Sequence, residues 1–429
     1  MDAIVNAVAL LIITYLQYKA LKSRGAYLAD PLDKSTMIYV DNHELFFIWL
    51  FSTGLFQCGE LLAIRLFILE LLCLYVIFSC RRKAVVSWPL AIYIIYMLWL
   101  CIGCTYTSAP IYGIRMILKY VYPLLAALMA SKIMVCHEVL RISFHRARQI
   151  ALIAAILCIV PFVESVAPTL LWYGTARTIH FISIICICLA LYYLAEPKDK
   201  RERMTAYVLM VPCVMWVFRT SILGTTCALA FFSSMKNGIK SVFTLVIIGT
   251  AFLGIVFMLP SVQEKMFRGT TKYSIEDLLT GEISKDDIDS NGRFHMWEIA
   301  ERRFYEGHEL MGSGSGMVQE FMYSNGEKQF AGVKIIHNDY LQMKCDNGLI
   351  GFWLFLLAEL GIVLHCTVVF RKTDDRWVKI CALSAGSSMV GVALTLITDN
   401  VVNYSMVTLS YPFMLYGSML GLIYHREDQ

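Results

Sequence analysis

Charged residues are scarce in this chain of 429 residues, because Asp, Glu, Lys and Arg together make up only 16% of it. A soluble globular domain carries about a quarter. Hydrophobic residues account for 58% of the chain, and the mean hydropathy is +0.61. This composition excludes an ordinary soluble enzyme. The net charge of +4 reflects basic loops, and we expect no nucleic-acid partner.

Sequence motifs of metal-binding, phosphate-binding and secreted proteins are also missing. No HExxH or DxD pattern occurs, and three histidines (His295, His308 and His337) lack the spacing of metal ligands. The run from Gly312 to Gly316 is not followed by GK[ST], so we interpret it as a flexible turn rather than a phosphate-binding loop. Residues 3–16 lack a basic segment and a small-residue cleavage site, so we expect no cleavable signal peptide. We expect neither a metal nor a cofactor.

Cysteine is plentiful, with 14 residues, but its distribution is not that of a disulfide scaffold. Many of these cysteines lie inside apolar stretches and are typical of small buried hydrophobic residues. Cys101 and Cys104 form a CxxC pattern within such a stretch. We favour a structural interpretation over a redox or metal role there.

Long hydrophobic runs are the dominant feature. Val242–Pro260 and Gly348–Phe370 are each long enough, at about 20 residues, to cross a bilayer. Runs of this length predict an all-α polytopic membrane protein with about 12 or 13 transmembrane helices, since a barrel would show short alternating segments. One polar interruption, Ser261–Asn347, divides the chain into transmembrane helices over 1–260, a large loop over 261–347, and transmembrane helices with a tail over 348–429.

Basic clusters predict the orientation, because Lys and Arg near span ends stay on the cytoplasmic side. The clusters are Arg81–Lys83, Arg141 to Arg148, Lys198–Arg203, Lys236 with Lys240, and Arg371 with Lys372. The spans expected between and after them are 84–103, 113–135, 149–166, 177–195, 204–218, 221–235, 242–260, 348–370, 378–397 and 404–424. All five clusters then lie inside, and the large loop lies outside. The number of spans near the N-terminus is left undecided, because residues 45–79 fit one or two spans and residues 2–18 add another.

Two arginines are candidates for binding an anion at the outer face. Arg219 falls at the tight turn between two short spans, where an arginine is costly unless it is paired or faces a wet cavity; the alternative is an interfacial arginine. Arg293 falls in the first turn of a helix expected from about Gly292 to Tyr305, with Ser290 or Asn291 as N-cap. Helix N-termini bind phosphate groups, so Arg293 and the backbone there suit an anion; the alternative is a solvated side chain.

His337 is the candidate base. It lies just before the chain re-enters lipid, and histidine side chains take up protons near neutral pH. Asp339 or Asn338 is available to orient it, and Tyr340 follows in the same segment. The alternative is a structural histidine. Arg115 and Lys119, spaced i,i+4 at the outer start of one span, would extend a basic cleft or else serve as interfacial anchors.

The motifs NGRFHMW, LMGSGSG and IIHNDYLQMKCDNGLIGFWLFLL together resemble the O-antigen polymerase and O-antigen ligase superfamily. Phe218–Leu223 is similar to that family's SRtaxl element, with Phe218 in place of the usual serine. The resemblance covers about residues 200–424. It implies a metal-independent membrane glycosyltransferase that uses glycans on undecaprenyl diphosphate. At the matching positions it implies that Arg219 and Arg293 contact the diphosphate and that His337 is the catalytic base.

The resemblance leaves the reaction open between two outcomes. A polymerase transfers the growing chain onto another lipid-linked repeat unit, whereas a ligase transfers it onto lipid A–core or a protein; we favour the polymerase. A transporter of the same lipid-linked glycan is a third reading, against which the single asymmetric loop argues. The implied setting is a multi-pass protein of the bacterial inner membrane with a periplasmic site. The implied partners are a glycan donor, a glycan acceptor, membrane lipids, and chain-length regulator and flippase proteins.

Overall fold

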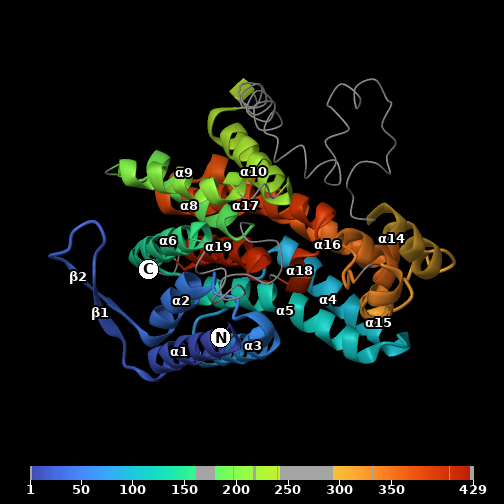
Figure 1. Cartoon of the computed structure of the whole chain (residues 1–429). Coiled ribbons are helices and arrows are strands. Elements are labelled where there is room, and N and C mark those ends of the chain that lie inside the picture. The colour runs from blue at the N-terminus through green and yellow to red at the C-terminus, as the bar shows by residue number, and fades with distance from the viewer. Residues whose placement is uncertain are drawn as a thin grey trace.

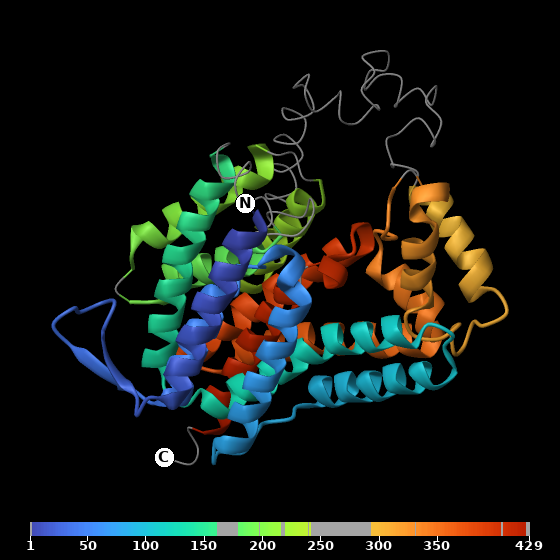
Figure 2. The same cartoon turned by 60° about the horizontal axis from the view of Figure 1, so that its bottom comes forward.

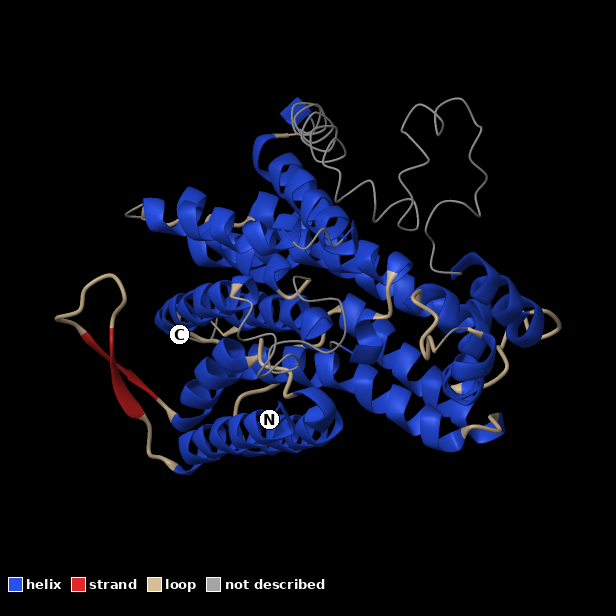
Figure 3. Ribbon diagram, in the orientation of Figure 1, coloured by secondary structure: helices blue, strands red, loops and turns tan. Residues whose placement is uncertain are grey.

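The fold is described by a computed structural model over residues 2–160, 179–196, 198–215, 219–238, 240–241, 293–330, 332–404 and 406–425. Almost all regular structure in these residues is helical, as Figure 3 shows, and this confirms the predicted all-α class. The one strand pair in the described part is a hairpin of β1 (Ala26–Ala29) and β2 (Met37–Val40), which projects from the bundle (Figure 1). The predicted span 242–260 and the first part of the loop, 261–292, lie outside the described residues.

Seven of the described helices are long and apolar enough to cross a membrane. They are α1 (Asp2–Lys22), α3 (Leu62–Ser79), α4 (Trp88–Tyr106), α5 (Pro110–Ile133), α6 (His137–Ile159), α16 (Asp339–Lys372) and α17 (Arg376–Thr398). The shorter helices that complete the bundle are α2 (Asn42–Thr53), η1 (Gly59–Leu61), α8 (Phe181–Leu194), α9 (Lys200–Met215), α10 (Arg219–Asn237), α18 (Val401–Tyr404) and α19 (Met406–Tyr424). The chain is therefore a multi-pass membrane protein.

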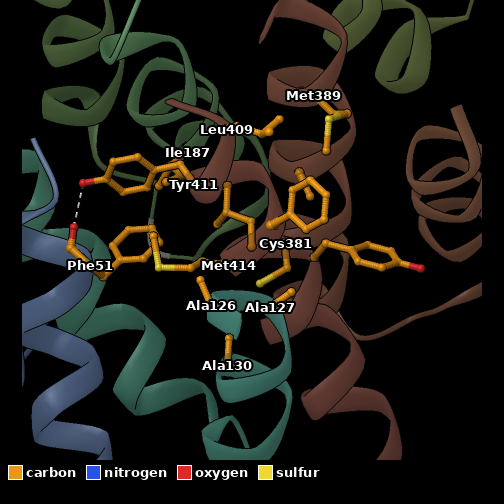
Figure 4. Packing of buried hydrophobic residues seen from close by; sticks show 14 of the residues in the cluster. Phe51, Ala126, Ala127, Ala130, Ile187, Cys381, Met389, Leu409, Tyr411 and Met414 are labelled. Carbon is orange, nitrogen blue, oxygen red and sulfur yellow. Dashed lines mark hydrogen bonds between the residues drawn. The ribbon is translucent and has the colours of Figure 1, made fainter. Parts of the chain in front are cut away.

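The core of the bundle forms where α5, α17 and α19 meet (Figure 4). Small side chains on α5 allow this closeness, since a Cβ added to Gly417 of α19 would lie 2.1 Å from the carbonyl oxygen of Ala127. Close approach of backbones is how helices associate in lipid, where burial of apolar surface supplies little driving force. Tyr411 ties α19 to α2 by donating a 2.7 Å hydrogen bond to the carbonyl oxygen of Phe51. All 14 cysteines are free thiols, which agrees with their interpretation as small packing residues.

The basic clusters gather at one end of this bundle. Arg82 donates to the carbonyl oxygen of Ile133, at 3.1 Å, and so ties the first cluster to the end of α5. Further contacts join the remaining clusters to one another: His137 stacks on Trp377, Arg376 pairs with Glu196, Arg148 pairs with Glu202, and Lys236 lies over the ring of Tyr193. This clustering is what the expected topology requires, while the cytoplasmic assignment of this end stays a prediction.

The described part of the large loop folds into a small unit of its own, seen beside the ends of α4 and α5 in Figure 2. It contains α14 (Arg293–Ala300), a π-helical turn η2 (Glu301–Tyr305), and α15 (Met317–Gln329). A second apolar cluster holds it to residues 339–347 at the start of α16: Met296, Ala300, Phe304, Val318, Phe321, Met322, Phe330, Ile336, Leu341 and Cys345. The helix predicted from about Gly292 to Tyr305 corresponds to α14 and η2.

Candidate functional site

α16 consists of two helical arms, residues 339–347 and 349–372, which meet at Gly348. The backbone of Gly348 has a positive φ of 65°. A Cβ there would lie 2.2 Å from the carbonyl oxygen of Leu310, so only glycine fits. The arms contact each other, because the hydroxyl of Tyr340 donates a 2.6 Å hydrogen bond to Glu359. This contact draws Tyr340 toward the second arm and gives it a structural role.

The glycine run Gly312–Gly316, interpreted from the sequence as a flexible turn, packs against residues 345–347 next to this break. The Asp346 carboxylate accepts hydrogen bonds from the backbone N–H groups of Gly316, at 3.1 Å, and Val318, at 2.9 Å. Ser315 donates to Asn347 at 2.7 Å. These hydrogen bonds join the loop unit to the first part of α16.

His337 sits between this loop unit and α16 in a left-handed backbone conformation, with φ 56°. That conformation is uncommon for a residue other than glycine and persists only where neighbours enforce it. Two hydrogen bonds do so here. The N–H of His337 donates to the side-chain oxygen of Asn400, and the indole of Trp297 donates to the carbonyl oxygen of Ile336 at 2.7 Å.

The His337 ring is paired with Asp399, through 2.8 Å between Nδ1 and Oδ1. Asp399 is the C-cap residue that follows α17, and its side chain is only 7% exposed. A carboxylate acceptor places the proton of a neutral imidazole on Nδ1, which leaves Nε2 as the acceptor. No described residue hydrogen bonds to Nε2. The pair therefore has the arrangement of a base and the group that orients it.

Neither of the orienting residues expected from the sequence forms a described hydrogen bond with the His337 ring. The Asn338 side chain accepts a 2.9 Å hydrogen bond from the N–H of Leu341 and so caps α16. The Asp339 carboxylate accepts from the Asn400 side chain at 2.9 Å and from the N–H of Val402 at 3.1 Å. Both residues support the site indirectly, because Asn400 in turn holds the backbone of His337.

The two arginines approach the same turn. Nη1 of Arg293 donates to the carbonyl oxygen of Thr398 at 2.7 Å, and no other described residue accepts from this half-buried guanidinium. Arg219 begins α10, although its side chain lies outside the described part. The next residue, Thr220, accepts a 3.2 Å hydrogen bond from the hydroxyl of Thr398. The backbone at Arg219, the Arg293 side chain and His337 thus meet around Thr398–Asn400.

The remaining expected residues flank the site on α5. Lys119 interacts electrostatically with Asp339 and with Arg115, which links it to the turn. The Arg115 side chain is exposed and lies 5.2 Å from the ring centre of Tyr112. Lys119 thus lies near the site, whereas the Arg115 contact is with an aromatic ring.

Sequence reasoning missed the turn itself, Thr398–Asn400. Its signal was a short polar triplet at the end of the apolar span 378–397. Such a triplet is also typical of any helix end, which is why it did not stand out.

Residues 204–356 match the family model described as O-antigen ligase. The match covers 153 of the 429 residues. The match supports the O-antigen ligase and polymerase superfamily, and in general terms the activity of a membrane glycosyltransferase of that type. The matched region includes Arg219, Arg293 and His337 but ends before Asp399. A comparison with curated proteins finds no match.

Proposed function

We propose that this chain is a glycosyltransferase that polymerises undecaprenyl-diphosphate-linked repeat units into a surface polysaccharide, at the outer face of a bacterial cytoplasmic membrane. One observation carries the proposal: the His337–Asp399 pair and the Arg293 guanidinium converge on one turn. A base beside a cationic group is what transfer from a diphosphate leaving group requires.

The base acts on the acceptor. Nε2 of His337 takes the proton of an acceptor sugar hydroxyl as its oxygen attacks the anomeric carbon of the donor. The bond from that carbon to the diphosphate oxygen breaks, and its electron pair leaves with the diphosphate. Asp399 stabilises the imidazolium that forms and keeps the ring in position.

The arginines act on the leaving group. One N–H of Arg293 is used by Thr398, and its other donors are available to phosphate oxygens. A planar guanidinium suits two phosphate oxygens at once, and it keeps its charge at any working pH. Arg219 is proposed to contribute the second guanidinium. In this proposal the two charges do the work of a metal ion, so the reaction needs no metal.

A ligase that transfers the finished polymer to lipid A–core or a protein is the second candidate, and the description of the matched family model favours it. The chemistry at His337 and Arg293 is the same in both reactions. Only the acceptor differs.

Deletion of the gene in its native host, followed by gel analysis of the surface glycan, tests the proposal. A polymerase deletion leaves single repeat units, whereas a ligase deletion accumulates lipid-linked polymer. Full-length His337→Ala should fail to restore the glycan although it inserts normally, because every transmembrane helix is retained. A surface glycan of normal length in cells that contain only His337→Ala would show that this residue is not the base.

A further inference from the structure

A pair of adjoining cavities lies at the end of the bundle where the basic clusters meet. The larger has a volume of about 670 Å³ and the smaller about 450 Å³. They share the side chains of His145, Arg148 and Arg201 along their walls. Both volumes fall in the range of about 300–1,000 Å³ that is typical of small-molecule sites.

These cavities are remote from His337. α17 begins at Arg376, which lines the larger cavity, and ends at Thr398, which accepts from Arg293. At 1.5 Å per residue, a helix of 23 residues separates the two ends by about 33 Å. The cavities are therefore distinct from the proposed catalytic site.

The carboxylates that line the larger cavity are each engaged by the protein. Glu202 pairs with Arg148, Glu196 with Arg376, Glu138 with His137, Asp199 accepts from the N–H of Arg201, and Asp375 caps α17. The smaller cavity is lined by a single carboxylate, Asp30, which pairs with Arg141. No described ion pair joins any of these carboxylates to a further lysine or arginine.

Three cations in these walls have no carboxylate partner among the described residues: Lys34, Arg146 and Arg201. Arg146 packs against the ring of Trp49, 5.7 Å from its centre, which holds its side chain in place. Lys34 and Arg146 both act electrostatically on His145, as Arg148 does, and Asp199 opposes them. Three positive groups are therefore gathered near this ring. Unpaired like charges at short range repel one another, and a bound anion relieves that repulsion.

The buried Arg148 side chain lies beside this cluster and is held by two contacts. The side chain is 10% exposed, with Nη1 bound to Glu202 and Nη2 3.0 Å from Nδ1 of His145. Arg148 and His145 are thus held in place by the protein itself. The smaller cavity joins three separate segments, namely the β1–β2 turn through Lys34, α6 through Arg146, and α9 through Arg201.

We propose that the smaller cavity binds a phosphate-bearing anion through Lys34, Arg146 and Arg201, and that binding ties the β1–β2 hairpin to α6 and α9. Phosphate oxygens suit the guanidinium fork and the lysine ammonium. Two sources share this chemistry: the head group of an anionic lipid in the adjoining leaflet, and a soluble phosphate compound.

The test uses full-length protein and thermal unfolding, with no activity assay. Each titration is repeated with Arg293→Ala, which removes a proposed diphosphate contact of the catalytic site, so that stabilisation from the cavity is told apart from stabilisation at that site. Inorganic diphosphate is titrated into protein in a neutral detergent, at constant ionic strength set with sodium chloride. In parallel, the protein is placed in nanodiscs of phosphatidylcholine alone or with phosphatidylglycerol. Diphosphate at 100 times its Kd should shift the unfolding equilibrium about 100-fold toward the folded state.

Stabilisation by diphosphate identifies the soluble source, and stabilisation by phosphatidylglycerol alone identifies the lipid head group. In either case the double variant Lys34→Ala/Arg201→Ala should weaken the effect at least tenfold. Both side chains are exposed, so the variant should fold. The matched control is Arg81→Ala, an exposed arginine at the same end outside both cavities, which should keep the full effect. Equal stabilisation of the double variant and the control, or no stabilisation by either probe, would overturn the proposal.

Discussion

Replacement of Asp399 by asparagine removes one charge from the proposed site and little else. The side chain keeps its size, and its oxygen can still accept the 3.0 Å hydrogen bond from the N–H of Asn400. The interaction that changes is the one with His337, where Asp399 faces an imidazolium during transfer. The Asp399 side chain is 7% exposed and that of His337 is 17% exposed, so water screens the pair only partly.

The size of the effect follows from this geometry. Nδ1 and Oδ1 are 2.8 Å apart, and the charges are spread over the ring and the carboxylate. Two unit charges about 4 Å apart interact by about 4 kcal/mol at an effective dielectric constant of about 20. Loss of that stabilisation in the transition state lowers the rate about 1,000-fold. Because the neutral ring of the ground state gains little from the carboxylate, kcat should fall and KM should stay nearly constant.

The assay measures initial rates of transfer by the purified full-length protein, with a synthetic polyprenyl-diphosphate glycan as donor. Asp33→Asn is the matched control, because Asp33 is an exposed carboxylate of the β1–β2 turn that bonds only to its neighbours Ser35 and Thr36. Its kcat should equal that of the unmodified protein. If Asp399→Asn retained kcat within about threefold, the carboxylate would have no part in supporting the base, and the reasoning from this pair would fail.

Three further predictions concern the leaving group, the helix break and the topology. Arg293→Lys or Arg219→Lys should still bind donor but lose turnover by roughly 30- to 1000-fold, and the loss in the double variant should be smaller than the two single losses combined. Activity should survive EDTA. A metal requirement, or an unchanged rate of Arg293→Ala, would contradict this. Gly348→Ala should lower the melting temperature and the yield of folded protein, because its Cβ would clash with the backbone of the preceding loop. In a cysteine-depleted background, a membrane-impermeant maleimide should label Glu327→Cys but not Lys200→Cys, and the reverse pattern would invert the topology.

Hydropathy was sufficient to predict the helical class, because long apolar runs leave few alternatives in a bilayer. His337 was selected from its place just before the chain re-enters lipid, and Arg293 from its place in the first turn of a loop helix. The roles of both residues stay predictions. Hydropathy could not identify the partner of His337. Asp399 lies 62 residues away, and no local pattern pairs the two.

Asp339, only two residues from His337, was the natural candidate, but it is the first residue of α16. Positions two apart do not share a face where a helix begins, so its carboxylate points to Asn400 instead. The glycine run is a similar case. Its sequence predicts backbone freedom, whereas the Asp346 carboxylate that accepts from the N–H of Gly316 comes from 30 residues further along.

The separation of His337 from Asp399 along the chain bears on how relatives of this protein can be recombined. A chimera cut at the borders of the matched region, 204–356, would take its base from one parent and the orienting carboxylate from the other. The exchangeable unit runs at least to residue 404, so that α14, both arms of α16, and the α17–α18 turn travel together. Chimeras that exchange this longer unit should keep the proposed base and its orienting carboxylate together, while the N-terminal helices are varied.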